Sequence, residues 1–247
     1  MPSAITSSSS TIRTLVTRYS TLVSRDQYEE LRAAFTASVS HELRTPLARL
    51  LTLLETAELP GADVSALLRH ARTEVEEMTE LVDDILFLSE LEQGREVVAL
   101  GETEAAPVLR AAVDECLERA ERAGVRLELR IEDETLHLPL RRRMLRTIVE
   151  NLLENTIRYA GEGATSTLSL RREDGALVLE ASDDGAGVPE EDAPRLFERF
   201  FRSDRARTTR GSGLGLAIVK HVVETAGGHV EARGAKNRGL DVRCSFP

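Results

Sequence analysis

The sequence has 247 residues, enough for one large domain or two modest ones with proper hydrophobic cores. Hydrophobic residues make up 41% and charged residues 30%, a balance typical of a globular protein in water. The net charge of −10 argues against a nucleic-acid-binding surface, because such a surface needs clustered cations.

No apolar run approaches the roughly 20 residues that a membrane-spanning helix needs, and no signal peptide precedes the first predicted helix. We therefore expect the chain to lie in the cytoplasm. If it belongs to a membrane receptor, the spanning segment and the sensor domain lie upstream of it. Residues 1–24 are predicted to be a linker or the tail of a signalling helix, because a serine run precedes weak helical periodicity between Ile12 and Leu22.

Two long amphipathic helices are predicted at about residues 27–59 and 63–92, separated by the helix-breaking segment Pro60-Gly61-Ala62-Asp63. Their apolar residues recur at steps of four and three, the spacing of a seam in a helical bundle. These seam residues are Leu43, Leu47, Leu50 and Leu54 in the first helix, and Ala71, Val75, Met78, Val82 and Ile85 in the second. A single hairpin cannot bury such a stripe, so residues 25–94 are expected to form a homodimeric four-helix bundle.

The first helix carries His41 within the run Phe35-Thr-Ala-Ser-Val-Ser-His-Glu-Leu-Arg-Thr-Pro-Leu47. The heptad spacing places His41 and Thr45 one turn apart, outside the seam and among small residues that leave room for a large molecule. A neutral imidazole keeps a lone pair and can act as a nucleophile. Pro46 has no N–H to donate to the carbonyl of Glu42, so a kink is expected beside His41. A histidine standing alone in such a helix is more often an ordinary surface residue.

From residue 95 the pattern becomes that of an α/β domain, in which strands of alternating polarity follow helices that must cover one face of a sheet. The predicted strands are 97–100, 125–131, 165–170, 177–182, 229–232 and 240–246, and the predicted helices are 107–122, 140–159 and 214–226. Residues 95–247 are therefore expected to form an α/β sandwich, joined to the hairpin through a hinge at Gln93-Gly94-Arg95.

Three polar residues lie on one face of the predicted helix 140–159: Asn151, Asn155 and Arg158, with Tyr159 next in sequence. An amide oxygen is a hard ligand suited to Mg²⁺, and a guanidinium pairs with phosphate. This helix face is therefore a candidate phosphate and metal site, although surface asparagines are common.

Two glycine-rich segments complete the polar set. In Asp183-Asp-Gly185-Ala-Gly187, a carboxylate able to accept a hydrogen bond from an exocyclic amine precedes glycines that let a ligand approach the backbone. In Gly211-Ser-Gly213-Leu214-Gly215, glycines open a predicted helix, whose free N–H groups favour phosphate. Neither segment has the spacing of a P-loop or of a dinucleotide-binding loop, and each alone is ambiguous.

Taken together, these segments resemble a known family. Residues 40–47, Ser-His-Glu-Leu-Arg-Thr-Pro-Leu, closely resemble the H box of sensor histidine kinases, in which the histidine is phosphorylated. The later segments resemble, in order and spacing, the N, G1 and G2 boxes of the GHKL (Bergerat) ATP-binding fold, and residues 195–202 look like its F box. The resemblance covers the chain from about Gln27 to the C-terminus and implies a homodimeric helical hairpin followed by this fold.

The resemblance also implies roles for single residues. Asp183 would recognise the adenine amine, Asn155 would hold Mg²⁺, and Arg158 with Tyr159 would contact the nucleotide. The full set of implied ATP-binding residues is Asn151, Asn155, Arg158, Tyr159, Asp183, Gly185, Gly187, Arg202, Gly211, Gly213, Leu214 and Gly215. ATPases of this fold carry a water-activating glutamate four positions before the metal-binding asparagine. Asn151 stands there, so ATP should be held without ready hydrolysis.

The family implies a reaction in which His41 attacks the γ-phosphate of Mg-ATP while Glu42 accepts a proton from the other ring nitrogen. The phosphoryl group would then pass to an aspartate of a response regulator receiver domain. The residue at the position of Thr45 helps to place water for the reverse, phosphatase, reaction. Two alternatives are a non-catalytic dimeric scaffold, opposed by the complete set of motifs, and a GHKL hydrolase or chaperone, opposed by Asn151 and the H box.

Overall fold

The computed structural model describes residues 25–92, 101–203 and 211–247, and the chain divides into two compact units, Met1–Ala71 and Arg72–Pro247. Among these described residues, no helix combines the length and the hydrophobicity that crossing a membrane requires. The predictions for residues 1–24, for the hinge at 93–95 and for the strand at 97–100 lie outside the described residues. The predicted domain boundary at residue 94 therefore stays a prediction.

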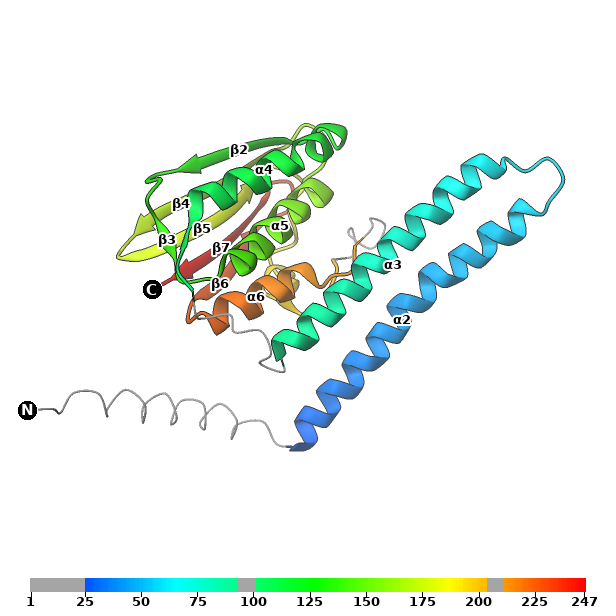
Figure 1. The fold of residues 1–247 in the computed structure, drawn as a ribbon, viewed down its shortest axis with the longest axis horizontal. Coiled ribbons are helices and arrows are strands. Elements are labelled where there is room, and N and C mark those ends of the chain that lie inside the picture. The colour runs from blue at the N-terminus through cyan, green and yellow to red at the C-terminus, as the bar shows by residue number, and fades with distance from the viewer. Residues whose placement is uncertain (1–24, 93–100, 204–210) are drawn as a thin grey trace, which may run out of the picture. The chain divides into compact units, whose positions relative to one another are not determined.

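The two long predicted helices are confirmed as α2 (Arg25–Ala57) and α3 (Val64–Glu92), which Figure 1 shows as the two longest helices of the chain. Helix α2 continues through Pro46. Asp63 caps α3 as predicted, because its Oδ1 accepts a hydrogen bond of 3.0 Å from the N–H of Ala66. Between the helices Gly61 has a φ of +84°, a left-handed conformation that suits glycine.

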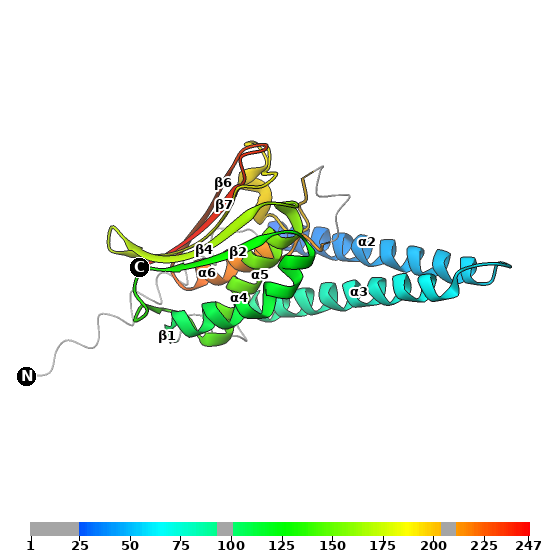
Figure 2. The same ribbon diagram turned by 90° about the horizontal axis from the view of Figure 1, so that it is seen from above.

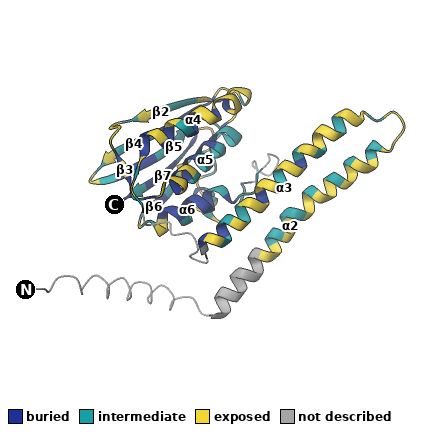
Figure 3. Ribbon diagram, in the orientation of Figure 1, coloured by how far each residue is buried: buried dark blue, intermediate teal, exposed yellow. Residues whose placement is uncertain are grey.

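Much of both helices is exposed, as the yellow ribbon in Figure 3 shows, and the exposed residues include large apolar ones. On α2, Leu47, Leu51 and Leu54 are between 53% and 58% exposed. On α3 the predicted seam residues are exposed or half-buried, namely Ala71, Val75, Met78, Val82 and Ile85. A second set of residues on α3, which the spacing analysis passed over, is buried instead, namely Glu74, Leu81, Leu88 and Leu91. Apart from Glu74 this second set is apolar, so the helix has two apolar stripes, as a helix with partners on more than one side would.

Most of the second unit is a five-stranded sheet in the order β2-β4-β5-β7-β6, covered on one face by α4, α5 and α6 (Figures 1 and 2). Strands β2 and β4 are parallel and the remaining pairs are antiparallel. The strands are β2 (Arg126–Ile131), β4 (Thr165–Glu173), β5 (Ala176–Asp183), β6 (His229–Gly234) and β7 (Leu240–Phe246). The helices are α4 (Ala105–Arg122), α5 (Arg142–Tyr159) and α6 (Gly215–Thr225). The predicted α/β sandwich is confirmed.

Three short elements were missed by the sequence analysis. A two-stranded antiparallel sheet joins β1 (Thr103–Glu104) to β3 (His137–Leu138), and a short 3-10 helix, η1 (Ala193–Phe197), overlaps the start of the F-box segment. Strands of two residues are too short to show the alternation of polarity on which a strand prediction depends.

The inner face of the sheet is apolar because alternate residues of each strand point towards the helices. In β4 these residues include Leu168 and Leu170, and in β5 they include Leu177, Leu179 and Ala181, all of them buried. At the end of this apolar face, β4 and β5 place Ser166 and Asp183, which are also buried.

The outer face of the sheet carries charged residues that pair from strand to strand. Arg171 of β4 lies 2.5 Å from Glu180 of β5. Arg243 of β7 lies 2.8 Å from Glu173 of β4 and 3.9 Å from Glu231 of β6. These partly exposed pairs form a network across four strands, so the two faces of the sheet differ sharply in polarity.

Candidate nucleotide site and phosphorylated histidine

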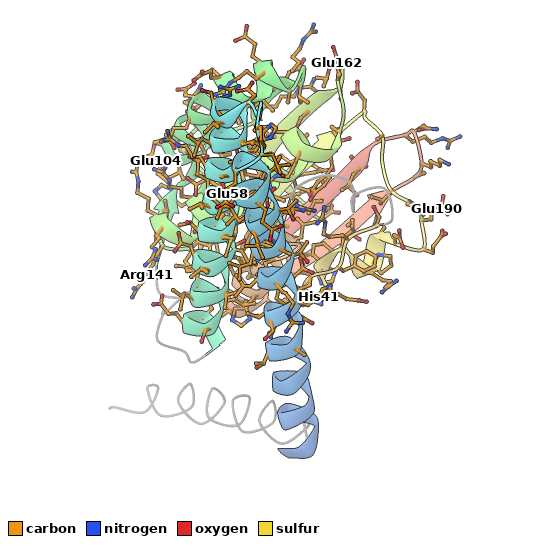
Figure 4. The ribbon with its side chains drawn as sticks, turned by 90° about the vertical axis from the view of Figure 1, so that its right-hand side faces the viewer. His41, Glu58, Glu104, Arg141, Glu162 and Glu190 are labelled. Carbon is orange, nitrogen blue, oxygen red and sulfur yellow. The ribbon has the colours of Figure 1, made fainter. Side chains whose placement is uncertain are left out.

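His41 lies on α2 in the first unit, with its side chain exposed (Figure 4). Thr45 is also exposed, one turn further along, and its hydroxyl donates a hydrogen bond of 3.3 Å to the carbonyl of His41. Glu42 is half-buried. The imidazole is therefore exposed, and its accessibility to a large substrate stays a prediction.

Helix α5 supplies the polar residues of the predicted N box. Asn151, Asn155, Arg158 and Tyr159 are half-buried, while the opposite face of the helix packs into the core through a set of fully buried residues. The Nδ2 of Asn151 donates a hydrogen bond of 2.8 Å to the carbonyl of Thr147. The amphipathic pattern of the helix thus turns its amide and guanidinium groups to one side.

The start of α6 packs directly against these α5 side chains. A Cβ atom added to Gly215 would lie 2.4 Å from Oδ1 of Asn151. A Cβ atom added to Gly211 would lie 2.5 Å from the hydroxyl oxygen of Tyr159 and 3.2 Å from Nη1 of Arg158. The fold therefore brings together the N-box and G2 residues that the sequence predicted to form one site, with little space between them for a larger residue at Gly211 or Gly215.

The F-box segment is joined to the same loop. The N–H of Phe200 donates a hydrogen bond of 3.0 Å to the carbonyl of Gly213, and a Cβ atom on Gly213 would lie 2.9 Å from the backbone of Phe200. Leu214, next to Gly213, is fully buried and anchors the start of α6. Arg202 is half-buried and follows the F-box aromatics.

Asp183 is the last residue of β5, and its side chain is buried on the inner face of the sheet. Its carboxylate accepts a hydrogen bond of 3.0 Å from the N–H of Gly185 and another from the backbone of Leu240. Burial raises the pKa of Asp183 above its ordinary value, and the two backbone hydrogen bonds partly offset that rise. The result is a fixed hydrogen-bond acceptor in an apolar setting.

The glycines after Asp183 allow close backbone packing, in addition to the approach of a ligand that the sequence suggested. A Cβ atom on Gly185 would lie 2.2 Å from the carbonyl oxygen of Ala160, and one on Gly187 would lie 2.1 Å from that of Ala235. The loop is tied to the end of α5 by a hydrogen bond of 2.8 Å from Ala186 to Ala160. These glycines therefore allow backbone to pack on backbone, in addition to any contact with a ligand.

Two acidic residues of α3, within the same compact unit, contact the donors of this site, and sequence reasoning missed both. The hydroxyl of Ser212 donates a hydrogen bond of 2.9 Å to Asp84 and accepts one of 3.2 Å from the N–H of Leu214. Arg158 lies 3.5 Å from Glu80. Burial raises the pKa of Asp84, and its hydrogen bond with Ser212 opposes the rise. The start of α6 and Arg158 thus attract negative charge, as a phosphate site must.

The described residues contain no cluster of three or more His, Cys, Asp or Glu side chains that could hold a metal ion. Mg²⁺ that binds together with a nucleotide usually takes one or two protein ligands and completes its shell with water and phosphate. The half-buried Asn155 carries an amide oxygen, which is a ligand of the type that Mg²⁺ takes.

Two family models match the chain. Residues 31–94 match the His Kinase A (phospho-acceptor) domain, and residues 140–247 match the histidine kinase-, DNA gyrase B- and HSP90-like ATPase. The sensor histidine kinase WalK of Bacillus subtilis is 30% identical over 237 residues, which are 90% of this chain and 38% of WalK. The sensor-like histidine kinase SenX3 of Mycolicibacterium smegmatis is 34% identical, over 89% of this chain and 58% of SenX3. The chain thus spans about half the length of the curated relatives it matches.

Solved structures give the same assignment of the fold. The Acinetobacter baumannii histidine kinase AdeS has a TM-score of 0.67 at 23% identity, over 83% of this chain and 96% of that one. The histidine kinase ThkA, solved in complex with the response regulator TrrA, has a TM-score of 0.73 at 19% identity, over 93% of this chain and 66% of that one. ShkA, solved in complex with AMPPNP, has a TM-score of 0.63 at 27% identity, over 85% of this chain and 45% of that one.

The phospho-acceptor domain comes first in the chain and the ATPase domain second, with the exposed His41 in the one and the assembled N, G1 and G2 residues in the other. The chain therefore belongs to the sensor histidine kinases, and it carries the phospho-acceptor and ATP-binding domains of that family.

Proposed function

We propose that this chain is an ATP-dependent protein kinase that phosphorylates its own His41 and passes the phosphoryl group to an aspartate of a response regulator. One observation carries this proposal. An exposed histidine in a phospho-acceptor domain occurs in the same chain as an ATPase-type site in which α5, the loop after β5 and the start of α6 converge.

In the proposed complex Asp183 accepts a hydrogen bond from the adenine amine, and Arg158 and Tyr159 contact the phosphates. Asn155 would supply an oxygen ligand to Mg²⁺, which neutralises charge on the phosphates when it is bound. The remaining proposed ATP-binding residues, which border the nucleotide, are Asn151, Gly185, Gly187, Arg202, Gly211, Gly213, Leu214 and Gly215.

The proposed chemical step takes place at the imidazole. One ring nitrogen of His41 attacks the γ-phosphorus, so an N–P bond forms while the bond to the bridging oxygen breaks and ADP leaves. Glu42 accepts the proton from the other ring nitrogen, which keeps the attacking nitrogen nucleophilic. Phosphoryl transfer depends mainly on positioning and charge neutralisation, so the step requires the two domains to come together.

The residues of α5 are poorly suited to activate water for the hydrolysis of ATP. Asn151 occupies the position where a hydrolase needs an acid, and its amide is already bonded to the carbonyl of Thr147. The neighbouring acids are held in ion pairs, Glu150 with Arg146 at 2.6 Å and Glu154 with Arg119. These contacts favour a site that binds ATP for transfer of its γ-phosphoryl group to histidine over a site that activates water.

The proposed partner is the receiver domain of a response regulator, docked on the helices that carry His41. ThkA has been solved with such a regulator, which supports this class of partner. Since ATP and response regulators are found in the cytoplasm, we expect these domains to work there.

Incubation with γ-labelled Mg-ATP tests the proposal directly. We expect label on the protein in a bond that acid hydrolyses and base does not, because a phosphoramidate is labile in acid. Label that survives acid would indicate a phosphoester on Ser or Thr, and steady release of phosphate without labelled protein would indicate a hydrolase.

We also predict a homodimer, because the helical hairpin exposes apolar residues such as Leu47, Leu51 and Leu54. Covering such a stripe with a second copy would bury the apolar side chains of both chains. Light scattering should find the full chain as a dimer at micromolar concentration, and residues 95–247 as a monomer that still binds ATP. A monomeric full chain would contradict the bundle.

For Thr45 we predict a role in dephosphorylation. Its exposed hydroxyl lies one turn from His41, where it can hydrogen-bond a water that attacks a phosphorylated regulator. Thr45→Ala should leave autophosphorylation and forward transfer within about threefold and slow dephosphorylation of the regulator by about tenfold or more. Both rates should be measured with the same regulator. Equal losses in both would mean that Thr45 shapes the helix instead.

A further inference from the structure

A row of residues crosses the inner face of the sheet at the end where Asp183 lies. Reading from β2 to β6, the residues directly opposite one another are Leu127, Ser166, Asp183, Leu240 and Gly234. Asp183 therefore has two direct neighbours in the sheet, Ser166 on β4 and Leu240 on β7. Of these two, Leu240 has an apolar side chain and Ser166 has a hydroxyl group.

Ser166 is an unusual residue for its position. Its side chain is 1% exposed, and its Oγ has no hydrogen-bond partner among the described residues. The next two inward-facing residues of β4, Leu168 and Leu170, are apolar and fully buried. The hydroxyl of Ser166 therefore makes no hydrogen bond that would stabilise this part of the sheet. A buried hydroxyl without a partner lowers stability, so its presence here points to a hydrogen-bond partner that is not part of the protein.

The chemistry of the pair Ser166 and Asp183 matches one edge of adenine. An ionised carboxylate only accepts hydrogen bonds, whereas a serine hydroxyl can donate one. The adenine edge presents an amino donor directly beside a ring-nitrogen acceptor, N1. Residues directly opposite in antiparallel strands have Cβ atoms about 5 Å apart, so both can act on neighbouring atoms of one ring.

We infer that the hydroxyl of Ser166 donates a hydrogen bond to N1 of adenine, directly or through one water, while Asp183 accepts from the amine. This inference rests on the proposed function, since it concerns how the same ATP site reads its base. The carboxylate of Asp183 is fixed by its hydrogen bonds from Gly185 and Leu240, so it cannot turn to serve both atoms. Ser166 thereby adds a second point of base recognition to the one that Asp183 supplies.

The test combines Ser166→Ala with 1-deaza-ATP, an ATP analogue that has a C–H group in place of N1. By calorimetry on the full chain, wild type should bind 1-deaza-ATP about three- to tenfold more weakly than ATP, the loss of one hydrogen bond. Ser166→Ala should bind ATP more weakly by a similar factor and show no further loss with the analogue. Its melting temperature should equal or exceed that of wild type, because an unpaired buried hydroxyl has been removed.

Thr167→Val is the matched control, because it also removes one hydroxyl from β4 but on the outer face of the sheet. It should leave the affinity for both nucleotides unchanged. Equal affinity of wild type for ATP and 1-deaza-ATP would overturn the inference whatever the variants do. If Ser166→Ala lowered the affinity for ATP and for 1-deaza-ATP by the same factor relative to wild type, the inference would also be overturned. A wild type that binds no ATP would instead refute the proposed function.

Discussion

His41→Gln is expected to abolish the transfer of label from γ-labelled ATP to the protein while leaving ATP affinity unchanged. Glutamine has no nucleophilic nitrogen, and it is a good helix former on the exposed surface of α2, so the fold should tolerate it. The nucleotide residues lie in the other compact unit. Autoradiography would measure the label and calorimetry the affinity, on the same preparation.

His70→Gln is the matched control, since His70 is an exposed histidine on α3 in the same helical hairpin. It should be labelled at the rate of wild type. Label that persists in His41→Gln, or that moves to a serine or threonine, would show that His41 is not the phosphorylated residue.

Asp183→Asn is expected to weaken ATP binding by about 1–3 kcal/mol, which is roughly 5- to 150-fold. The amide can present an NH₂ group where the adenine amine needs an acceptor. Because the site is buried, water cannot replace the lost hydrogen bond. Asp184→Asn is the control, because Asp184 is exposed and adjacent in sequence. Unchanged affinity in Asp183→Asn would contradict the assignment of the adenine site.

The same carboxylate should make ATP affinity depend on pH. Burial raises the pKa of Asp183, so lowering the pH through that raised value protonates the group and removes its acceptor. The affinity of wild type for ATP should therefore fall more steeply than that of Asp183→Asn as the pH is lowered through this raised pKa. The contribution of Asp183 to the free energy of unfolding should change in the opposite direction. Above the raised pKa the buried charge is destabilising, so this contribution becomes more favourable as the pH falls.

The sequence predicted the long elements well because each has a period that its own residues display. The apolar spacing of four and three gave α2 and α3 to within about two residues at their ends, and alternation gave β7 from Leu240 to Phe246. The site residues came from short motifs whose order matched a known family. Their convergence in space, such as Asn151 against Gly215, required the structure.

What could not be predicted are contacts between distant parts of the chain. Nothing local to Ser212 indicates that Asp84, 128 positions earlier, accepts its hydrogen bond. Nor does the local sequence around Ser166 reveal that Asp183 lies directly opposite, because strand pairing decides which residues become neighbours. The buried second face of α3, with Leu81 and Leu88, was passed over because two overlapping apolar stripes on one helix obscure each other.

The charged network on the outer face of the sheet has a consequence for solubility. A bare apolar surface across five strands would attract a second sheet and favour aggregation. Here an approaching sheet would have to strip water from Arg171, Glu180, Arg243 and Glu231, and their partly exposed ion pairs would not repay that desolvation. The face that carries no helices can therefore remain bare in water without a second layer of structure to cover it.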